Sequence, residues 1–340
     1  MGLGLFLRQR VFKLVSTSYS LESLSKALPV AGRALFLKAS FNQSLIDSLN
    51  YLLEACHDAV PSSLFSKATQ KINSLSVTSK LSGLLGVIHS NLFNAAEQND
   101  LTKVCSTLER FSDDNLQHEN LTYVNLSNVD DYYSPLVRHV FSQELKREVE
   151  YYSLPSEDFE KAKCSIQRGI QIIERSFPDF YAELQDLVSE ILVVKARGLK
   201  QGSSSDLFGM VYKSSLFRGE KVTDAVDFLI HEQSHLYVHA LNKDDPILLN
   251  PAQMYYSPLR EEDRPLMGIY HATFVLSRMQ YVLGKALTIN EIPDEEQEYC
   301  KELIGRYQQC FHEGFDTIMT HGQMTPLGSA LIQSARTLLP

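Results

Sequence analysis

Apolar residues recur every three to four positions along much of the chain, which is the spacing of one face of an α-helix. Before residue 115, Leu45, Leu49, Leu52 and Leu53 follow this pattern. Further helices are predicted over residues 155–177, 179–197, 266–287 and 294–320, with a last short helix that opens at Pro326. The periodicity therefore predicts a predominantly helical protein.

Two short runs break the helical pattern and predict strands. One begins at Leu121, and the other, Leu-Phe-Gly-Met-Val-Tyr at 207–212, follows a polar loop that begins at Gln201. The stretch 244–265 is rich in Pro and Asp, so we expect it to be irregular. The fold class expected is α+β, mostly helical, with a few short strands.

The domain boundary is weakly marked. We divide the chain into a helical N-terminal region, 1–150, and a second region, 151–340, although both could belong to one domain. The N-terminal region could bind a peptide.

One predicted helix carries two histidines four residues apart, in the run His-Glu-Gln-Ser-His at 231–235. Thr223 can cap this helix. Residues four apart share a helix face, so His231 and His235 can offer two imidazole nitrogens to one ion. Glu232 flanks that site, and in zinc proteases the equivalent glutamate is the general base. Such short motifs also arise by chance, but the position after an apolar helix start favours a metal site.

A third ligand decides the chemistry. His271 lies inside the apolar helix predicted over 266–287. A lone histidine on an apolar face is more often a core residue, but two partners upstream favour a ligand here. His239 continues the spacing of four, and we expect it to pack or to meet solvent. Three carboxylates are nearer in sequence but lie in a charged stretch, where a solvated face is expected: Glu261, Glu262 and Asp263.

Two arginines, Arg260 and Arg264, lie between the motif and His271, close to prolines. A guanidinium near a metal can hold a carboxylate through two hydrogen bonds. The alternative is that both arginines pair with the neighbouring acidic residues. Sequence spacing does not decide between these two readings.

Composition limits the binding partners and the cellular compartment that we expect. The net charge of −9 argues against a nucleic-acid binder, which needs a basic surface. No apolar run is long enough to span a bilayer, and the first ten residues place apolar before basic residues, the reverse of a secretory signal. The five cysteines are scattered and form no C-x-x-C pair, which favours free thiols in a reducing compartment, the cytoplasm.

The order of several segments resembles a known family, the HExxH-motif proteins encoded near ribosomally made, modified peptides. The similar segments are Phe-Gly-Met-Val-Tyr, His-Glu-Gln-Ser-His, Tyr-Ser-Pro-Leu-Arg-Glu-Glu-Asp-Arg-Pro-Leu-Met-Gly, Tyr-His-Ala and Thr-Pro-Leu-Gly. They span about residues 200–335. Members of that family act as α-ketoglutarate-dependent peptide β-hydroxylases. One departure is Leu259, where the family favours Trp.

The resemblance implies an oxygenase that uses iron(II), α-ketoglutarate and O2, with a precursor peptide as its partner. The implied metal ligands are His231, His235 and His271. Arg260 and Arg264 become candidates for the α-ketoglutarate carboxylate. The alternative function is a zinc metallopeptidase with Glu232 as general base. A metal-free peptide-binding protein is a third possibility, and the intact motif argues against it.

Overall fold

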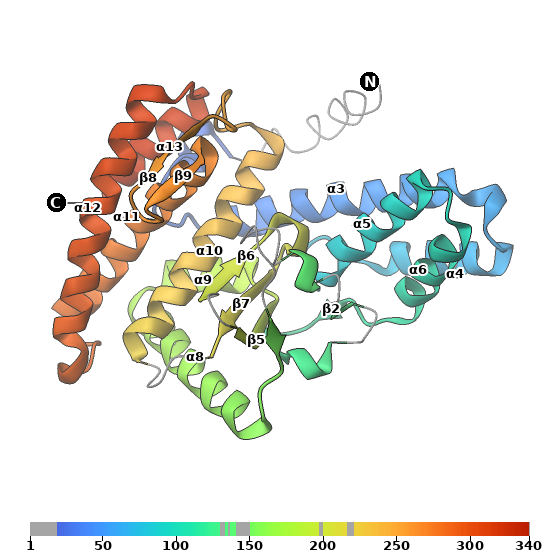
Figure 1. Cartoon of the computed structure of the whole chain (residues 1–340), viewed down its shortest axis with the longest axis horizontal. Coiled ribbons are helices and arrows are strands. Elements are labelled where there is room, and N and C mark those ends of the chain that lie inside the picture. Colours follow the sequence, from blue (N-terminus) through green and yellow to red (C-terminus); the bar gives the residue numbers. More distant parts are fainter. Residues whose placement is uncertain are drawn as a thin grey trace. The chain divides into compact units, whose positions relative to one another are not determined.

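The computed structural model describes residues 19–129, 133–134, 137–140, 150–196, 200–215 and 221–339. The described residues form mostly helices with a few short strands, which confirms the expected α+β class (Figure 1). They belong to two compact units. Unit 1 contains those in 35–155 and 186–216, and unit 2 contains those in 16–34, 156–185 and 217–340. Each unit is thus assembled from separated stretches of the chain, and neither is a single continuous region.

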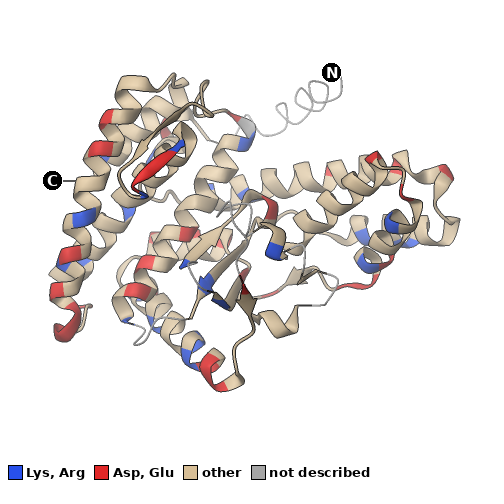
Figure 2. Ribbon diagram, viewed as in Figure 1, with Lys and Arg blue, Asp and Glu red and all other residues tan. Residues whose placement is uncertain are grey.

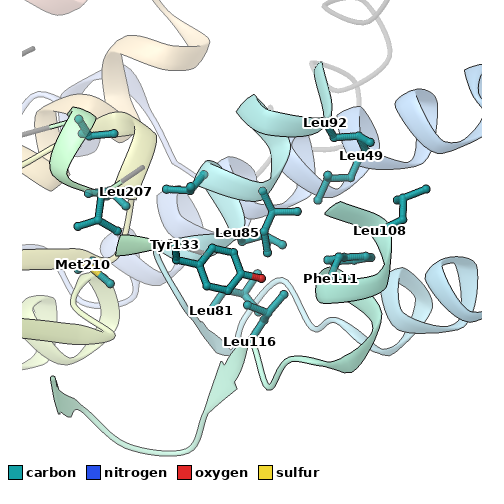
Figure 3. Packing of buried hydrophobic residues seen from close by; sticks show 14 of the residues in the cluster. Leu49, Leu81, Leu85, Leu92, Leu108, Phe111, Leu116, Tyr133, Leu207 and Met210 are labelled. Carbon is teal, nitrogen blue, oxygen red and sulfur yellow. The ribbon is translucent and has the colours of Figure 1, made fainter. Parts of the chain in front are cut away.

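Unit 1 contains a group of amphipathic helices. They are α3 (Arg33–Ala55), most of which belongs to this unit, α4 (Ser62–Ser74), α5 (Leu84–Glu97) and α6 (Leu101–Asp113). Leu49, Leu52 and Leu53 of α3 are buried, so the predicted apolar face is confirmed. Figure 3 shows leucines from α3, α5 and α6, with Phe111 of α6, in one apolar core. Burial of that shared face holds the helices together.

A small sheet completes unit 1. Its strands lie in the order β3 (Thr122–Asn125), β5 (Glu190–Ala196), β7 (Met210–Ser214), β6 (Gln201–Ser203). β3 and β7 are parallel to β5, β6 is antiparallel to β7, and β4 (Tyr151–Tyr152) adds an antiparallel pairing to β5. A two-stranded pairing of β1 (Lys80–Leu81) with β2 (Gln117–His118) lies apart from this sheet. The predicted strand after Leu121 is confirmed, whereas the second begins later than expected because 205–207 form a 3-10 turn.

The helix predicted over 179–197 is wrong in its second half. α9 (Pro178–Leu187) ends early, and β5 begins at Glu190. Residues Ile191 to Val194 are all fully buried, because a central parallel strand is covered on both faces. A continuous apolar run of this kind fits a buried helix or a buried strand equally well. The stretch from Gln201 was expected to be a loop. It forms β6 instead, because it pairs with the neighbouring strand β7.

Unit 2 is built on long helices. They are α8 (Ser156–Ser176), α10 (Val222–Asp244), α11 (Leu266–Thr288), α12 (Gln297–His321) and α13 (Pro326–Arg336), with the short α2 (Leu21–Leu24) and most of α9. The predicted helices over 155–177, 266–287 and 294–320 and the one opening at Pro326 are confirmed. The side chain of Thr325 caps α13 by accepting from the Gly328 N–H.

The cap of α10 differs from the predicted one. The Thr223 side chain does not cap the helix, because the carboxylate of Glu296 takes that place. It accepts from the Val222 N–H at 3.0 Å, the Thr223 N–H at 2.9 Å and the Thr223 hydroxyl at 2.8 Å. A negative charge stabilises the positive end of a helix, and this one comes from far along the chain.

Residues 244–265 were expected to be irregular, and this is wrong for their second half. β8 (Met254–Ser257) and β9 (Glu262–Pro265) form an antiparallel hairpin. The Ser257 carbonyl accepts from the N–H groups of Arg260 and Glu261, and Glu261 adopts a φ of 56° in the turn. α11 begins directly after β9.

Two further predictions bear on the whole chain. All five cysteines lie within the described residues and are free thiols, as predicted. Among the helices that the structure describes, none is long and apolar enough to cross a membrane.

Candidate metal centre

α10 and α11 bring four histidines together. His231, His235 and His239 follow one another along α10, and His271 lies near the start of α11. The two helices run antiparallel. His239 packs against His271 with ring centroids 4.8 Å apart, whereas His231, earlier on α10, contacts Met279, later on α11.

His231 and His235 present their outer ring nitrogens to each other. The Nε2 atoms are 3.1 Å apart. Two imidazole nitrogens that bind one ion at about 2.1 Å each, at roughly a right angle, lie about 3 Å apart. The distance within the pair therefore matches that between two neighbouring ligands of a transition metal, and metal binding by the pair stays a prediction.

His271 adjoins this pair from a different side. Its Nδ1 lies 3.3 Å from Nδ1 of His235, the ring nitrogen of His235 that faces away from His231. Among the residues with a described placement, no three His, Cys, Asp or Glu side chains are arranged to hold one ion. The structure thus brings the three predicted ligands together, and the role of His271 as the third ligand stays a prediction.

His239 is part of the same cluster. It was expected to pack or to meet solvent, and it is half-buried, with its ring centroid 6.4 Å from that of His235. The sequence signal for its membership was the third histidine at the same spacing. His239 therefore has to be tested beside the three predicted ligands.

The environment of His235, His239 and His271 favours their neutral form. Burial lowers the pKa of His235 well below its ordinary value, and the neighbouring histidines and Arg260 lower it further. Burial lowers the pKa of His239 to about 4 and also lowers the pKa of His271. A neutral imidazole has a free lone pair, which is the form that binds a metal.

Two contacts flank the pair. Nδ1 of His231 lies 3.3 Å from the sulfur of Met279, a residue that the sequence did not single out. Glu232 is fully buried, and its Oε1 lies 3.7 Å from Nε2 of His231. The carboxylate thus borders the side of the ring that faces His235, as expected of a glutamate in this motif.

The opposite side of α10 is anchored by a buried ionic cluster. Gln233 donates from Nε2 to Oε1 of Glu183 at 3.3 Å, and Arg278 pairs with the same carboxylate oxygen. Arg33 lies 3.5 Å from the other oxygen, and both guanidinium groups have no exposed surface. These contacts fix the rotation of α10, so the histidine side is held toward α11.

The two candidate arginines differ. Arg264 pairs with Glu262 at 3.1 Å within the hairpin, which is the alternative that the sequence left open. Arg260 lies exposed in the turn between β8 and β9, and its charge is close enough to lower the pKa of His235. Its guanidinium forms no hydrogen bond or ion pair with a residue that the structure describes. Arg260 is therefore the better candidate for an anionic ligand.

The three nearby carboxylates do not join the cluster. Glu261, Glu262 and Asp263 are all exposed, which confirms the solvated face predicted for them.

No protein-family model and no curated protein matches this chain.

Proposed function

We propose that this chain is an iron(II)- and α-ketoglutarate-dependent oxygenase that hydroxylates the β-carbon of a side chain in a ribosomally made precursor peptide. The observation that carries the proposal is the facing pair of Nε2 atoms on His231 and His235, with a third histidine, His271, beside it. The guanidinium of Arg260, which pairs with no residue that the structure describes, supports it.

His231 and His235 would hold the metal, with His271 as the predicted third ligand. When bound, iron(II) with α-ketoglutarate and O2 supplies the oxidising power to hydroxylate an unactivated carbon. A set of two or three protein ligands leaves positions open for the co-substrate. The buried contacts of Gln233 on the far side of α10 keep the pair in place.

Arg260 would bind the carboxylate of α-ketoglutarate that lies far from the metal. A guanidinium makes two parallel hydrogen bonds to a carboxylate, which fixes its orientation as well as neutralising its charge. Glu232, buried beside His231, would keep that ring in place. In this function Glu232 accepts no proton from water.

One observation favours a second candidate, a zinc metallopeptidase. Oε1 of Glu232 is 3.7 Å from Nε2 of His231, so the carboxylate borders the space where a metal-bound water would lie. There it could act as general base. That function requires no co-substrate, so Arg260 would have no part in it.

Reconstitution of the purified protein distinguishes the two functions. The protein is purified without oxygen and loaded with iron(II) or zinc(II), and succinate release from α-ketoglutarate is measured in air together with cleavage of a peptide library. We expect succinate release with iron only, lost in His235→Ala and kept in the control His312→Ala, whose ring bonds to the Gln308 carbonyl on α12. Peptide cleavage by the zinc form, without succinate release by the iron form, would replace the oxygenase with the peptidase.

A further inference from the structure

The β8–β9 hairpin has one open edge. In an antiparallel pair, residues alternate between those whose backbone groups bond across the pair and those whose groups point outward. The Leu266 N–H donates to the Gln253 carbonyl at 2.8 Å, and the register places Met254 opposite Pro265 and Tyr256 opposite Asp263. The N–H and C=O groups of Met254 and Tyr256 therefore point away from β9.

Those outward groups are not used within the part of the chain that the structure describes. No hydrogen bond links the backbone of Met254 or Tyr256 to a described residue. The opposite edge of the hairpin is different, because Pro265 has no N–H to offer and Asp263 carries a charge. β8 is thus the edge on which an additional strand can form.

The side chains on this edge are apolar and exposed. Met254 is 50% exposed and Tyr256 is 56% exposed, and both lie on one face of the hairpin because side chains alternate along a strand. Leu249, a few residues earlier, is 66% exposed. Exposed apolar groups on an open edge are the features by which a sheet recognises an extended peptide.

The charge on the hairpin selects among peptides. Figure 2 shows acidic residues along β9. Glu262 is paired with Arg264, whereas the exposed carboxylates of Glu261 and Asp263 form no ion pair with any residue in the described stretches. Basic side chains on a bound peptide would neutralise these carboxylates.

The hairpin also leads to the histidine cluster. β9 ends at Pro265 and α11 begins at Leu266, so the hairpin is joined directly to the helix that carries His271. A peptide bound along β8 would therefore lie on the segment that leads into α11. We infer that β8 binds the substrate as an extended peptide that carries apolar and basic residues, an assignment that rests on the proposed function.

Binding can be measured without metal or co-substrate. The probe is fluorescein-labelled Val-Lys-Val-Lys-Val-Lys, and the comparison peptides are Val-Glu-Val-Glu-Val-Glu and the lysine peptide methylated on every backbone nitrogen. We expect the lysine peptide to bind, and the glutamate and methylated peptides to bind at least about fivefold more weakly, the effect of one lost hydrogen bond or charge pair. Equal binding of the methylated peptide, or no binding of the lysine peptide at about 1 mM, would overturn the assignment.

Variants of the protein test whether the peptide binds along the open edge of β8. Tyr256→Pro removes an outward N–H and the ring, and Tyr256→Ala removes the ring alone, so the backbone effect is the difference between them. We expect Tyr256→Pro to bind the lysine peptide about fivefold more weakly than Tyr256→Ala. Tyr51→Ala, which removes another exposed tyrosine, on α3, is the control and should bind as the unmodified protein does. Equal affinity of the two Tyr256 variants, each with an unchanged circular dichroism spectrum, would overturn the assignment.

The result of the peptide-binding measurements does not depend on whether the protein releases succinate. Edge-dependent peptide binding without succinate release would refute the proposed oxygenase and leave β8 as a peptide-binding strand. Succinate release, together with peptide binding that is unaffected by backbone methylation of the peptide and by Tyr256→Pro, would refute the strand assignment but not the oxygenase.

Discussion

Nδ1 of His231 lies 3.3 Å from the sulfur of Met279, on the neighbouring helix. When Nδ1 carries the proton and donates to the sulfur, the lone pair stays on Nε2, the nitrogen that faces His235. Histidine ligands in proteins commonly donate the proton of their second nitrogen to an oxygen, which is a stronger acceptor than a thioether. We therefore expect Met279 to act as a positioning residue for His231.

Met279→Leu should weaken metal binding about tenfold, because loss of the partner of a metal ligand typically costs ten- to a hundredfold in affinity. Met279→Gln, whose amide oxygen accepts a hydrogen bond, should restore the affinity. Titration with cobalt(II), followed by its visible absorption bands, measures both. Met319→Leu, an exposed methionine on α12, is the control. Identical cobalt affinity in Met279→Leu and the unmodified protein would show that the sulfur has no positioning role.

His231→Ala or His235→Ala should remove most bound metal, because each change leaves at most two of the predicted ligands. His271→Ala should weaken binding clearly, and His239→Ala should leave it nearly unchanged. Metal content of protein purified without oxygen measures these effects. Full retention of metal in His271→Ala together with loss in His239→Ala would move the third ligand from α11 to α10.

Arg260→Ala should raise the KM for α-ketoglutarate roughly ten- to a hundredfold, because hydrogen bonds between charged groups contribute about 1.5–3 kcal/mol. Bound iron should not change. Arg260→Lys should restore only part of the affinity, since an ammonium cannot make the two parallel hydrogen bonds. Arg264→Ala is the matched control, because that side chain is already paired with Glu262. A larger rise in KM for Arg264→Ala than for Arg260→Ala would reverse the assignment.

Glu232→Gln should keep its metal and lose only part of its succinate-forming activity, since an oxygenase needs no base at this position. In a peptidase the same change would abolish cleavage almost completely. The two activities are compared in one preparation of the variant, with metal content as the control. Complete loss of succinate formation with full metal content would assign Glu232 a direct part in the oxygenase reaction.

Glu183→Ala should destabilise the protein by about 3–5 kcal/mol, because it leaves the buried guanidinium groups of Arg33 and Arg278 without a counter-charge. Urea unfolding followed by circular dichroism measures the change. Glu157→Ala breaks an exposed pair with Lys161 and should leave the unfolding midpoint almost unchanged. Equal stability of the two variants would mean that the buried cluster is not what holds α10.

Local pattern was sufficient to predict the helix that carries His231 and His235 and most other helices of unit 2. It failed where a distant partner decides the structure. Ile191 to Val194 form a strand because parallel strands from elsewhere cover both of their edges, and nothing within the run itself excludes a helix.

The candidate site shows the same limit. The spacing of four predicted that His231 and His235 would face one another, because that relation lies within one helix. The contact of His231 with Met279, and the choice between Arg260 and Arg264, depend on how α11 and the hairpin pack. Such tertiary contacts have no signature in the spacing of residues along the chain.

The cap that Glu296 provides has a consequence for biosynthesis. The carboxylate that closes the N-terminal end of α10 lies 73 residues beyond Thr223 in the sequence. While the ribosome is still synthesising α11, the helix that carries His231 and His235 therefore lacks its cap. A nascent chain cut short before Glu296 would contain all four clustered histidines, but the helix that carries three of them would have a frayed start, so we expect metal capture by unit 2 to follow the synthesis of Glu296.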